Sequence, residues 1–418
     1  MPFSSHLCKN ATTEYILFNF PVTAKILDVG CGNGIYSDLL KPKGYKLDGI
    51  EVYKPNIEKF NLCSKYDRLF EINAIDMPAD AHYDLVIFGD VLEHFSAEDA
   101  SYIISRYKSF CDVILVSVPY KMGQGAYEGN GYEIHLQPDL DDKIFSERYP
   151  DFKNLIVESA GGETIATWIY DGRPTVMINI LLKNSVQYFD KLMDNVSKLM
   201  YPKSKISLVF LENDSEDDTY TLVRKRASDV MCHSGYKRMR IDRVPLGFKL
   251  LPTERHLDSK QSERLSALKK LRNHVNKEMY LGEDYVWNLD HDFIFMDKWL
   301  LNKMVSANKD VLMVPVTLQD KSIYDLGTGI LTDEKKFLLI PDVIKANPGK
   351  ELIRITVCGA ACFFRGSLIG KGVSYSSLDN LEQEGVSFSM SARSLGAEIW
   401  LLAKENIIHQ STDGKKGR

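Results

Sequence analysis

Two stretches of the sequence place residues suited to ligand chemistry directly after an apolar run. In the first, the run at 26–29 is followed by Gly30, Gly32 and Gly34. Glycines at alternate positions let the backbone turn tightly and approach a ligand closely, and the helix that follows presents free N–H groups. Glu51 ends the next apolar run, where a carboxylate can accept hydrogen bonds from both hydroxyls of a ribose. This spacing predicts a nucleotide-binding loop.

The second stretch is Trp-Asn-Leu-Asp-His-Asp, in which Asp290 and Asp292 end an apolar run. Alternate side chains of an extended segment face the same way, and paired carboxylates bind a hard divalent cation that neutralises a diphosphate. Upstream, the acidic segment at 212–218 also ends an apolar run. This segment predicts contacts from Asp214 to a base or ribose, or alternatively an N-cap for the next helix.

The elements that must position these residues alternate along the chain. Apolar runs rich in Val, Ile and Leu are typical of strands buried on both faces of a parallel sheet, with helices between them. The first part predicts strands at 26–29, 47–50, 85–88, 113–118, 155–158 and 165–170, and helices at 34–40, 97–110 and 141–149. The second part predicts strands at 175–182, 206–211, 285–289, 311–314 and 358–365, helices at 186–199, 219–229 and 263–278, and a helix-to-strand segment at 395–402. The predicted fold class is α/β in both parts.

Length and charge predict two domains. The chain has 418 residues, 44% hydrophobic and 26% charged, which is too long for one ordinary core but typical of globular proteins. The turn signal Asp-Gly-Arg-Pro predicts the boundary, giving domains 1–172 and 173–418. The first domain carries a net charge of −11 and the second +6. We expect no nucleic-acid partner for the acidic domain, because phosphate contacts dominate that affinity, whereas the basic domain suits a nucleotide ligand.

Hydropathy and cysteine usage indicate a cytoplasmic location. No run approaches the roughly 20 apolar residues that a membrane span requires, so we expect no transmembrane segment. The N-terminus lacks the basic-then-apolar pattern of a secretory signal. The closest pair of the seven cysteines, Cys358 and Cys362, has no further His or Cys partners for a zinc site. We therefore expect reduced thiols in the cytoplasm, or in the host cytoplasm if the protein is viral.

Three further acidic residues are in step with the glycine loop: Asp28 in the first strand, Asp76 after a turn and Asp90 after the run at 85–88. With Asp-Val-Gly-Cys-Gly-Asn-Gly as the loop and a Glu-His after Asp90, the first domain resembles the class I S-adenosylmethionine-dependent methyltransferases. The resemblance implies a Rossmann-like fold with S-adenosylmethionine as cofactor. It implies that the glycines bind the methionine part, Glu51 the ribose and Asp76 the adenine, with Asp28 and Asp90 also at the cofactor.

The segment expected to contact the methyl acceptor in this domain is Gly-Asn-Gly-Tyr-Glu-Ile-His at 129–135. The segment is similar to one in small-molecule methyltransferases of sugar and polyketide pathways. His135 is predicted to be the general base for a hydroxyl or an acceptor-binding residue. The alternative is a histidine hydrogen-bonded to loop backbone. His94 is the second candidate.

The second domain resembles the GT-A glycosyltransferases, most closely the Anp1/Mnn9 group of mannosyltransferases. The matching segments lie at 180–184, 214–219, 271–273, 289–292, 359–365, 382–385 and 407–409. The resemblance implies a nucleotide-sugar donor, a UDP- or GDP-sugar, and a divalent metal, Mn²⁺ or Mg²⁺. It implies His409 as a third metal ligand beside Asp290 and Asp292, and Glu384 or Glu382 as the residue facing the acceptor or the reacting sugar.

Two arginines complete the predicted donor site. Arg264 and Arg272 project from the predicted helix at 263–278 and are suited to phosphate oxygens, next to Asp214 and Asp290. The alternative for both arginines is a solvated helix face.

Together these patterns predict a bifunctional glycan-modifying enzyme. It would transfer a sugar from a nucleotide-sugar donor and O-methylate a sugar hydroxyl, acting on a glycan or a lipid-linked or protein-linked saccharide. Three alternatives remain at this point: a single-activity transferase whose other domain is a scaffold, a non-catalytic protein that binds sugar nucleotides or glycans, and an enzyme that modifies a nucleobase in DNA.

Overall fold

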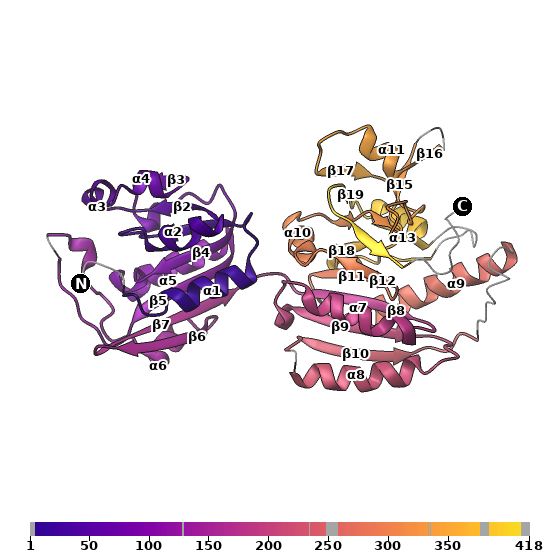
Figure 1. Ribbon diagram of the computed structural model, residues 1–418, viewed down its shortest axis with the longest axis horizontal. Coiled ribbons are helices and arrows are strands. Elements are labelled where there is room, and N and C mark those ends of the chain that lie inside the picture. The colour runs from indigo at the N-terminus through magenta and orange to yellow at the C-terminus, as the bar shows by residue number, and fades with distance from the viewer. Residues whose placement is uncertain are drawn as a thin grey trace. The chain divides into compact units, whose positions relative to one another are not determined.

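The computed structural model describes residues 5–127, 129–233, 235–247, 258–332, 334, 336–376 and 384–410. The chain divides into two compact units, Met1–Arg173 and Pro174–Arg418, and each unit mixes helices with strands (Figure 1). Each unit has its own large sheet, so each is described by itself.

The first unit is built on a seven-stranded sheet in the order β3-β2-β1-β4-β5-β7-β6. Its strands are β1 (Lys25–Val29), β2 (Lys46–Ile50), β3 (Arg68–Phe70), β4 (Tyr83–Gly89), β5 (Cys111–Pro119), β6 (Lys153–Ala160) and β7 (Glu163–Asp171). The first five strands are parallel, whereas β7 is antiparallel to both β5 and β6. Because parallel strands end at the same edge, the turns after β1, β2, β4 and β5 meet there.

Helices and short turns connect these strands. They are α1 (Lys9–Asn19), α2 (Ile35–Leu40), η1 (Lys41–Lys43), α3 (Lys54–Lys59), α4 (Leu62–Lys65), η2 (Ala74–Asp76), η3 (Leu92–His94), α5 (Ala97–Lys108), η4 (Gly131–Glu133) and α6 (Asp142–Arg148). Helix α5 begins where the Ser96 hydroxyl accepts a hydrogen bond from the Asp99 N–H at 3.1 Å. It buries Ile103, Ile104 and Tyr107 in the core.

The second unit holds an eight-stranded sheet in the order β10-β9-β8-β11-β18-β13-β19-β17. Its strands are β8 (Val176–Leu182), β9 (Ile206–Glu212), β10 (Arg238–Arg243), β11 (Tyr285–Asp290), β13 (Val311–Met313), β17 (Leu352–Ile355), β18 (Phe363–Arg365) and β19 (Ile399–Leu402). Strands β8, β9, β10 and β11 run parallel. The acidic ends of β9 and β11 therefore lie at the same edge.

Two small sheets and a set of helices complete this unit. The small sheets are β12 (Phe293–Met296), β20 (Ile407–His409) and β14 (Val316–Thr317), and β15 (Gly329–Leu331) with β16 (Phe337–Leu339). The helices are α7 (Val186–Lys198), η5 (Lys203–Lys205), α8 (Thr219–His233), α9 (Asp258–His274), the π-helix η7 (Val275–Met279), α10 (Leu300–Ser306), α11 (Ile340–Lys345), α12 (Ser367–Gly370) and α13 (Glu384–Ser394). Figure 1 shows α8 alongside the edge strand β10. No helix among the described residues is long and apolar enough to cross a membrane.

The predicted α/β elements form, but several details differ. Strands β3 and β10 were not predicted; both lie at a sheet edge, and β10 reads Arg-Met-Arg-Ile-Asp-Arg, which lacks an apolar run. The strand predicted at 358–365 is only β18, because the part before Phe363 has no regular strand pairing. The predicted helix at 263–278 begins earlier, as α9, and its last turn is the π-helix η7. Edge strands are half-exposed, so their hydropathy does not mark them.

Candidate functional sites

The glycine loop between β1 and α2 has a backbone that only glycine adopts easily. Gly30, Gly32 and Gly34 have φ values of 63°, 52° and 80°. A Cβ atom on Gly30 would lie 2.6 Å from Cγ2 of Val91, so a side chain there would also clash. The glycines therefore fix a tight turn at the carboxyl end of β1, as the alternate spacing predicts.

Glu51 directly follows β2, and its side chain is fixed in part by the same loop. Its carboxylate accepts hydrogen bonds from the backbone N–H groups of Gly32 at 2.9 Å and Tyr53 at 2.8 Å. The side chain is only 5% exposed, and burial raises its pKa. Each carboxylate oxygen has more than one lone pair, so both can still accept a bond from a ligand hydroxyl.

A cavity of about 820 Å³ opens above the carboxyl edge of this sheet. Its lining includes four predicted cofactor residues, namely Gly30, Gly32, Glu51 and Asp90. The acceptor candidates His94 and His135 line the same cavity, together with Glu93 and Glu133. One cavity is therefore lined by both the glycine loop and a set of acid and base side chains.

Three residues predicted at the cofactor do not line this cavity. Asp28 is buried behind the loop, where its carboxylate accepts a hydrogen bond from the Tyr66 hydroxyl at 2.6 Å and burial raises its pKa to about 7. Gly34 shapes the start of α2. Asp76 is exposed at the end of the η2 turn, and Asn73 and Ala74 of that turn line the cavity in its place. The reason is geometric, because the 3₁₀ turn directs its first residues inward and its last one outward.

Asp90 follows β4 and has a buried partner that the sequence did not reveal. It has a φ of 59°, and its Oδ2 lies 3.0 Å from Nζ of Lys9. Lys9 is 2% exposed; burial opposes its charge, but the Asp90 carboxylate holds the Lys9 pKa above its usual value. A lysine in a helix before the first strand belongs to no motif, so no signal in the sequence marks it.

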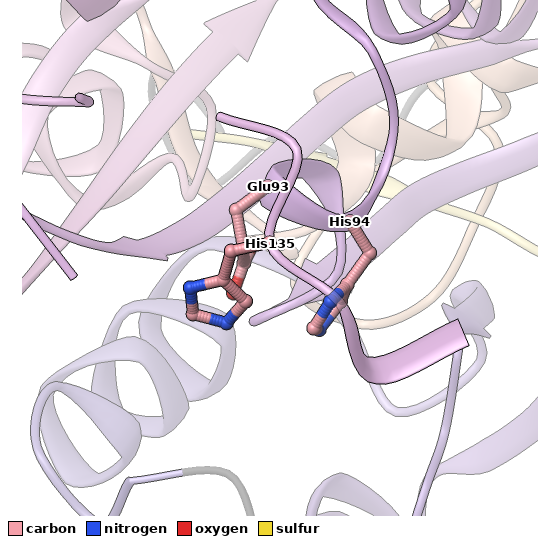
Figure 2. Close-up of side chains that lie close together, drawn as sticks. All are labelled: Glu93, His94 and His135. Atoms are coloured by element: carbon pink, nitrogen blue, oxygen red, sulfur yellow. The ribbon is translucent and has the colours of Figure 1, made fainter. Parts of the chain in front are cut away.

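His94 and His135 face each other at the cavity, with Glu93 beside them (Figure 2). Their ring centroids lie 4.9 Å apart at an interplanar angle of 66°. Nδ1 of His135 lies 2.8 Å from the Met122 carbonyl oxygen, and Nδ1 of His94 lies 3.3 Å from the Ile134 carbonyl oxygen. A carbonyl only accepts, so each Nδ1 carries the proton and each Nε2 has a free lone pair.

Burial favours the neutral form of both imidazoles. Burial, followed by the neighbouring His135, lowers the pKa of His94 to about 4. Burial also lowers the pKa of His135. Two neutral rings with free Nε2 atoms can accept a proton or bind a cation. The hydrogen bond from His135 to the loop backbone engages Nδ1 and is therefore compatible with a functional role for Nε2.

In the second unit, Asp290 ends β11 and Asp292 follows it. Pairing of β12 with β20 brings His409 to this point, and its Nε2 lies 2.9 Å from Oδ1 of Asp292. Burial raises the pKa of Asp292, but the contact with His409 and the nearby His291 lower it overall. Within the described part of the chain, Asp290, Asp292 and His409 do not form a cluster whose ligand atoms all lie within 4.8 Å of one another. Of the three predicted metal ligands, Asp292 and His409 are thus in contact, but the full set of three is not gathered.

Arg272 on α9 lies between two of the predicted carboxylates. Its Nη2 is 3.5 Å from Oδ1 of Asp290, and its Nε is 4.0 Å from Oε1 of Glu384. The arginine is 5% exposed, and its Nη1 has no hydrogen-bond partner among the described residues. Burial raises the pKa of Glu384, whereas Arg272 lowers it. Arg272 is therefore no solvated helix residue; Arg264, two turns earlier, is exposed.

Comparison with known proteins identifies both units. A family described as "Methyltransferase domain" matches residues 5–111, and the family described as "Anp1" matches residues 167–334. The procollagen galactosyltransferase 1-B of Xenopus laevis is 26% identical over 151 residues, 36% of this chain and 24% of that protein. The ubiquinone biosynthesis O-methyltransferase of Rickettsia typhi is 31% identical over 100 residues, 21% of this chain and 40% of that protein. A solved structure of S. aureus TarS, residues 1–349, has a TM-score of 0.38 at 16% identity and covers 56% of this chain and 60% of its own.

Residues 5–111 thus match a methyltransferase domain and residues 167–334 an Anp1 domain, and the two units are called by these names below. The matched stretches cover less than half the length of the curated relatives named above. The methyltransferase domain contains the assembled cavity, and the Anp1 domain contains the acidic strand end with Arg272.

Two further predicted residues of the Anp1 domain are Asp214 and Glu382. The carboxylate of Asp214 accepts hydrogen bonds from the backbone N–H groups of Leu246 at 3.2 Å and Gly247 at 3.1 Å. Asp214 thus anchors the segment after β10. Glu382 lies outside the described residues. The sequence also missed Tyr324, whose ring stacks on His409 with centroids 3.7 Å apart.

Proposed function

We propose that this chain is a bifunctional enzyme of glycan synthesis. Its methyltransferase domain, 1–172, O-methylates a sugar hydroxyl with S-adenosylmethionine. Its Anp1 domain, 173–418, transfers a sugar from a UDP- or GDP-sugar with the help of a divalent metal. The acceptor is a glycan or a lipid-linked or protein-linked saccharide, and fusion of the two domains raises the local concentration of a shared intermediate.

The cavity of the methyltransferase domain carries this proposal. It is large enough for a cofactor and part of an acceptor, and it joins the glycine loop and Glu51 to the two neutral histidines. The residues present fit S-adenosylmethionine: the two Glu51 oxygens suit its ribose hydroxyls, and the turn at Gly30 and Gly32 allows close approach of its methionine part. The bound cofactor supplies a methyl group on a positively charged sulfur.

The protein's own part in methyl transfer is to orient the acceptor and remove a proton. The Met122 carbonyl fixes His135 in the tautomer with a free Nε2. That atom can accept the proton of a hydroxyl as the oxygen attacks, or can bind the hydroxyl in place. Glu51, fixed by two backbone N–H groups, holds the cofactor at the other end.

The Anp1 domain has a donor set that fits a divalent metal and a diphosphate. Asp292 and His409 are adjacent, and oxygen and nitrogen ligands of this kind suit Mn²⁺. When bound, the metal stabilises negative charge on the departing diphosphate. The unpartnered Nη1 of Arg272 is placed to donate to a phosphate oxygen, and Glu384 next to it is suited to face the acceptor.

Thermal-shift and calorimetric titration of the whole chain tests the proposal. The ligands are S-adenosylhomocysteine and a panel of UDP- and GDP-sugars, each with and without manganese. A ligand at about 100 times its Kd stabilises the folded state by about 2.7 kcal/mol. We expect one shift from S-adenosylhomocysteine and an independent, manganese-dependent shift from one nucleotide sugar, followed by turnover of both donors.

Other results of these titrations would support one of the alternative functions. A shift from one class of ligand alone would reduce the protein to a single activity with a scaffold domain. Both shifts without any turnover or hydrolysis of the donors would favour a binding protein. No shift from either class would contradict the proposal outright.

A further inference from the structure

Three side chains in the methyltransferase cavity bring metal-ligating atoms together from two separate turns. Glu93 and His94 belong to the η3 turn after β4, and His135 lies in the loop after η4. One ligand atom from each lies within 4.8 Å of the other two (Figure 2). Two ligands at 2.0–2.2 Å from one cation lie at most about 4.4 Å apart, so small side-chain rotations complete the set.

Both histidines are prepared as metal ligands. The Met122 and Ile134 carbonyls each accept the Nδ1 proton of one ring, which fixes its orientation and leaves Nε2 as the unprotonated nitrogen. Metal-binding histidines are held by this kind of outer hydrogen bond. The two turns are also tied together, because the Glu93 carbonyl accepts bonds from Leu136 N–H at 2.8 Å and Gln137 N–H at 3.1 Å.

The carboxylate of Glu93 is the second, independent observation. The residue is 1% exposed, yet its Oε2 has no hydrogen-bond partner among the described residues. A buried polar atom without a partner destabilises the fold by about 1–3 kcal/mol unless something binds it. No arginine or lysine supplies a salt bridge to Glu93 in the described part of the chain; Lys9 pairs with Asp90 instead.

We propose that Glu93, His94 and His135 bind a divalent transition-metal cation at the acceptor end of the methyltransferase cavity. Two imidazoles and one carboxylate suit Mn²⁺, Fe²⁺, Co²⁺ or Zn²⁺ better than Ca²⁺ or Mg²⁺, which prefer oxygen ligands. Three protein ligands leave coordination positions open, as in catalytic sites. These positions face the cavity and suit two adjacent hydroxyls of a sugar.

This site deepens the proposed methyl transfer and rests on it. The cation lowers the pKa of the acceptor hydroxyl, and a water molecule takes the proton. The oxygen then attacks the methyl carbon, an O–C bond forms, and the C–S bond breaks with its electron pair going to sulfur. The products are a methyl ether, a neutral thioether and one proton. His135 then acts as a ligand, because an Nε2 bound to a metal cannot also accept a proton.

Cobalt binding by the full chain tests the site without any need for turnover. The starting protein carries Asp292→Asn, which disables the metal site proposed for the Anp1 domain. Co²⁺ is followed by its visible absorption and by calorimetry. We expect one Co²⁺ per chain, with affinity at least tenfold weaker in each of Glu93→Gln, His94→Gln and His135→Gln. His82→Gln is the matched control, because His82 pairs with Asp112 in an exposed position and should leave binding unchanged.

The outcomes separate this inference from the proposed function. Absence of Co²⁺ binding, or binding that survives all three substitutions, overturns the metal site. S-adenosylhomocysteine titration of each variant checks that the domain is folded. Methyl transfer that resists chelation but is lost in His135→Gln would also overturn the metal site, while leaving methyl transfer with His135 as the base intact. Failure of S-adenosylhomocysteine to bind any form would instead overturn the methyltransferase proposal.

Discussion

Each domain has an aspartate at the carboxyl end of a central strand, and the two differ in how they are held. Asp90, directly after β4, is paired with the buried Lys9 at 3.0 Å. Asp290, the last residue of β11, faces Arg272 only at 3.5 Å. Around Asp90 the glycine loop, Glu51 and the histidines already enclose a cavity, whereas around Asp290 the predicted metal ligands are incompletely gathered among the described residues. The candidate site around Asp90 is thus assembled by the fold, whereas the one around Asp290 is only partly assembled among the described residues.

The largest effect is expected from Asp292→Asn. The change removes one anionic metal ligand and its contact with His409, so sugar transfer should fall by about 10³-fold, or about 4 kcal/mol. S-adenosylhomocysteine affinity should not change. Sugar transfer is measured as turnover of the nucleotide sugar that thermal shift identifies. S-adenosylhomocysteine affinity is measured by calorimetry. Asp194→Asn, which affects only an exposed pair with Lys198, is the control. If S-adenosylhomocysteine affinity fell together with sugar transfer, the two sites would not be independent.

A smaller effect is expected from the glycine loop. Gly30→Ala imposes a positive φ on alanine and a clash with Val91, which together should destabilise the methyltransferase domain by about 2–5 kcal/mol. Gly162→Ala has a φ of 89° but meets nothing within 4 Å, so it should cost only about 1–2 kcal/mol. Denaturant unfolding, with the methyltransferase transition assigned by its response to S-adenosylhomocysteine, compares the two. Equal losses would refute the close packing of the loop against Val91.

The pH dependence of stability tests the buried Asp28. Its folded-state pKa of about 7 lies above the ordinary value of 3.8, so the folded domain binds more protons than the unfolded chain between these pH values. Stability should therefore be full below pH 3.8 and should be lost progressively as pH rises towards 7. Asp28→Asn should remove this slope and stabilise the domain by about 2–4 kcal/mol above pH 7. Melting temperatures from pH 4 to 8 measure it; identical slopes in both proteins would mean that Asp28 is ionised in the fold.

The smallest effect concerns Glu51. In Glu51→Gln an amide NH₂ would have to replace one oxygen that accepts from Gly32 or Tyr53, so S-adenosylhomocysteine affinity should fall by about 10-fold to 100-fold. Calorimetry measures the change, and Glu58→Gln on the exposed side of α3 is the control. Unchanged affinity would place the ribose elsewhere in the cavity.

The sequence by itself determined the features that depend on neighbours along the chain. The alternation of apolar runs and helices predicted both α/β sheets, and Gly30, Gly32 and Glu51 could be proposed as cavity residues because they lie in the turns that follow strands. Position at a strand end is a local property, since the strand and its turn are adjacent in sequence. For the same reason His135 could be named from its glycine-rich loop.

Only the tertiary structure decided which side chains meet. Lys9 reaches Asp90 across 81 residues, and the Met122 carbonyl fixes the tautomer of His135. Burial raised the pKa of Asp28 and left Oε2 of Glu93 without a hydrogen-bond partner among the described residues, and the backbone at 73–76 placed Asn73 at the cavity and Asp76 outside it. Burial and partner choice depend on which segments pack together in space. Residue spacing along a single chain carries no record of that packing.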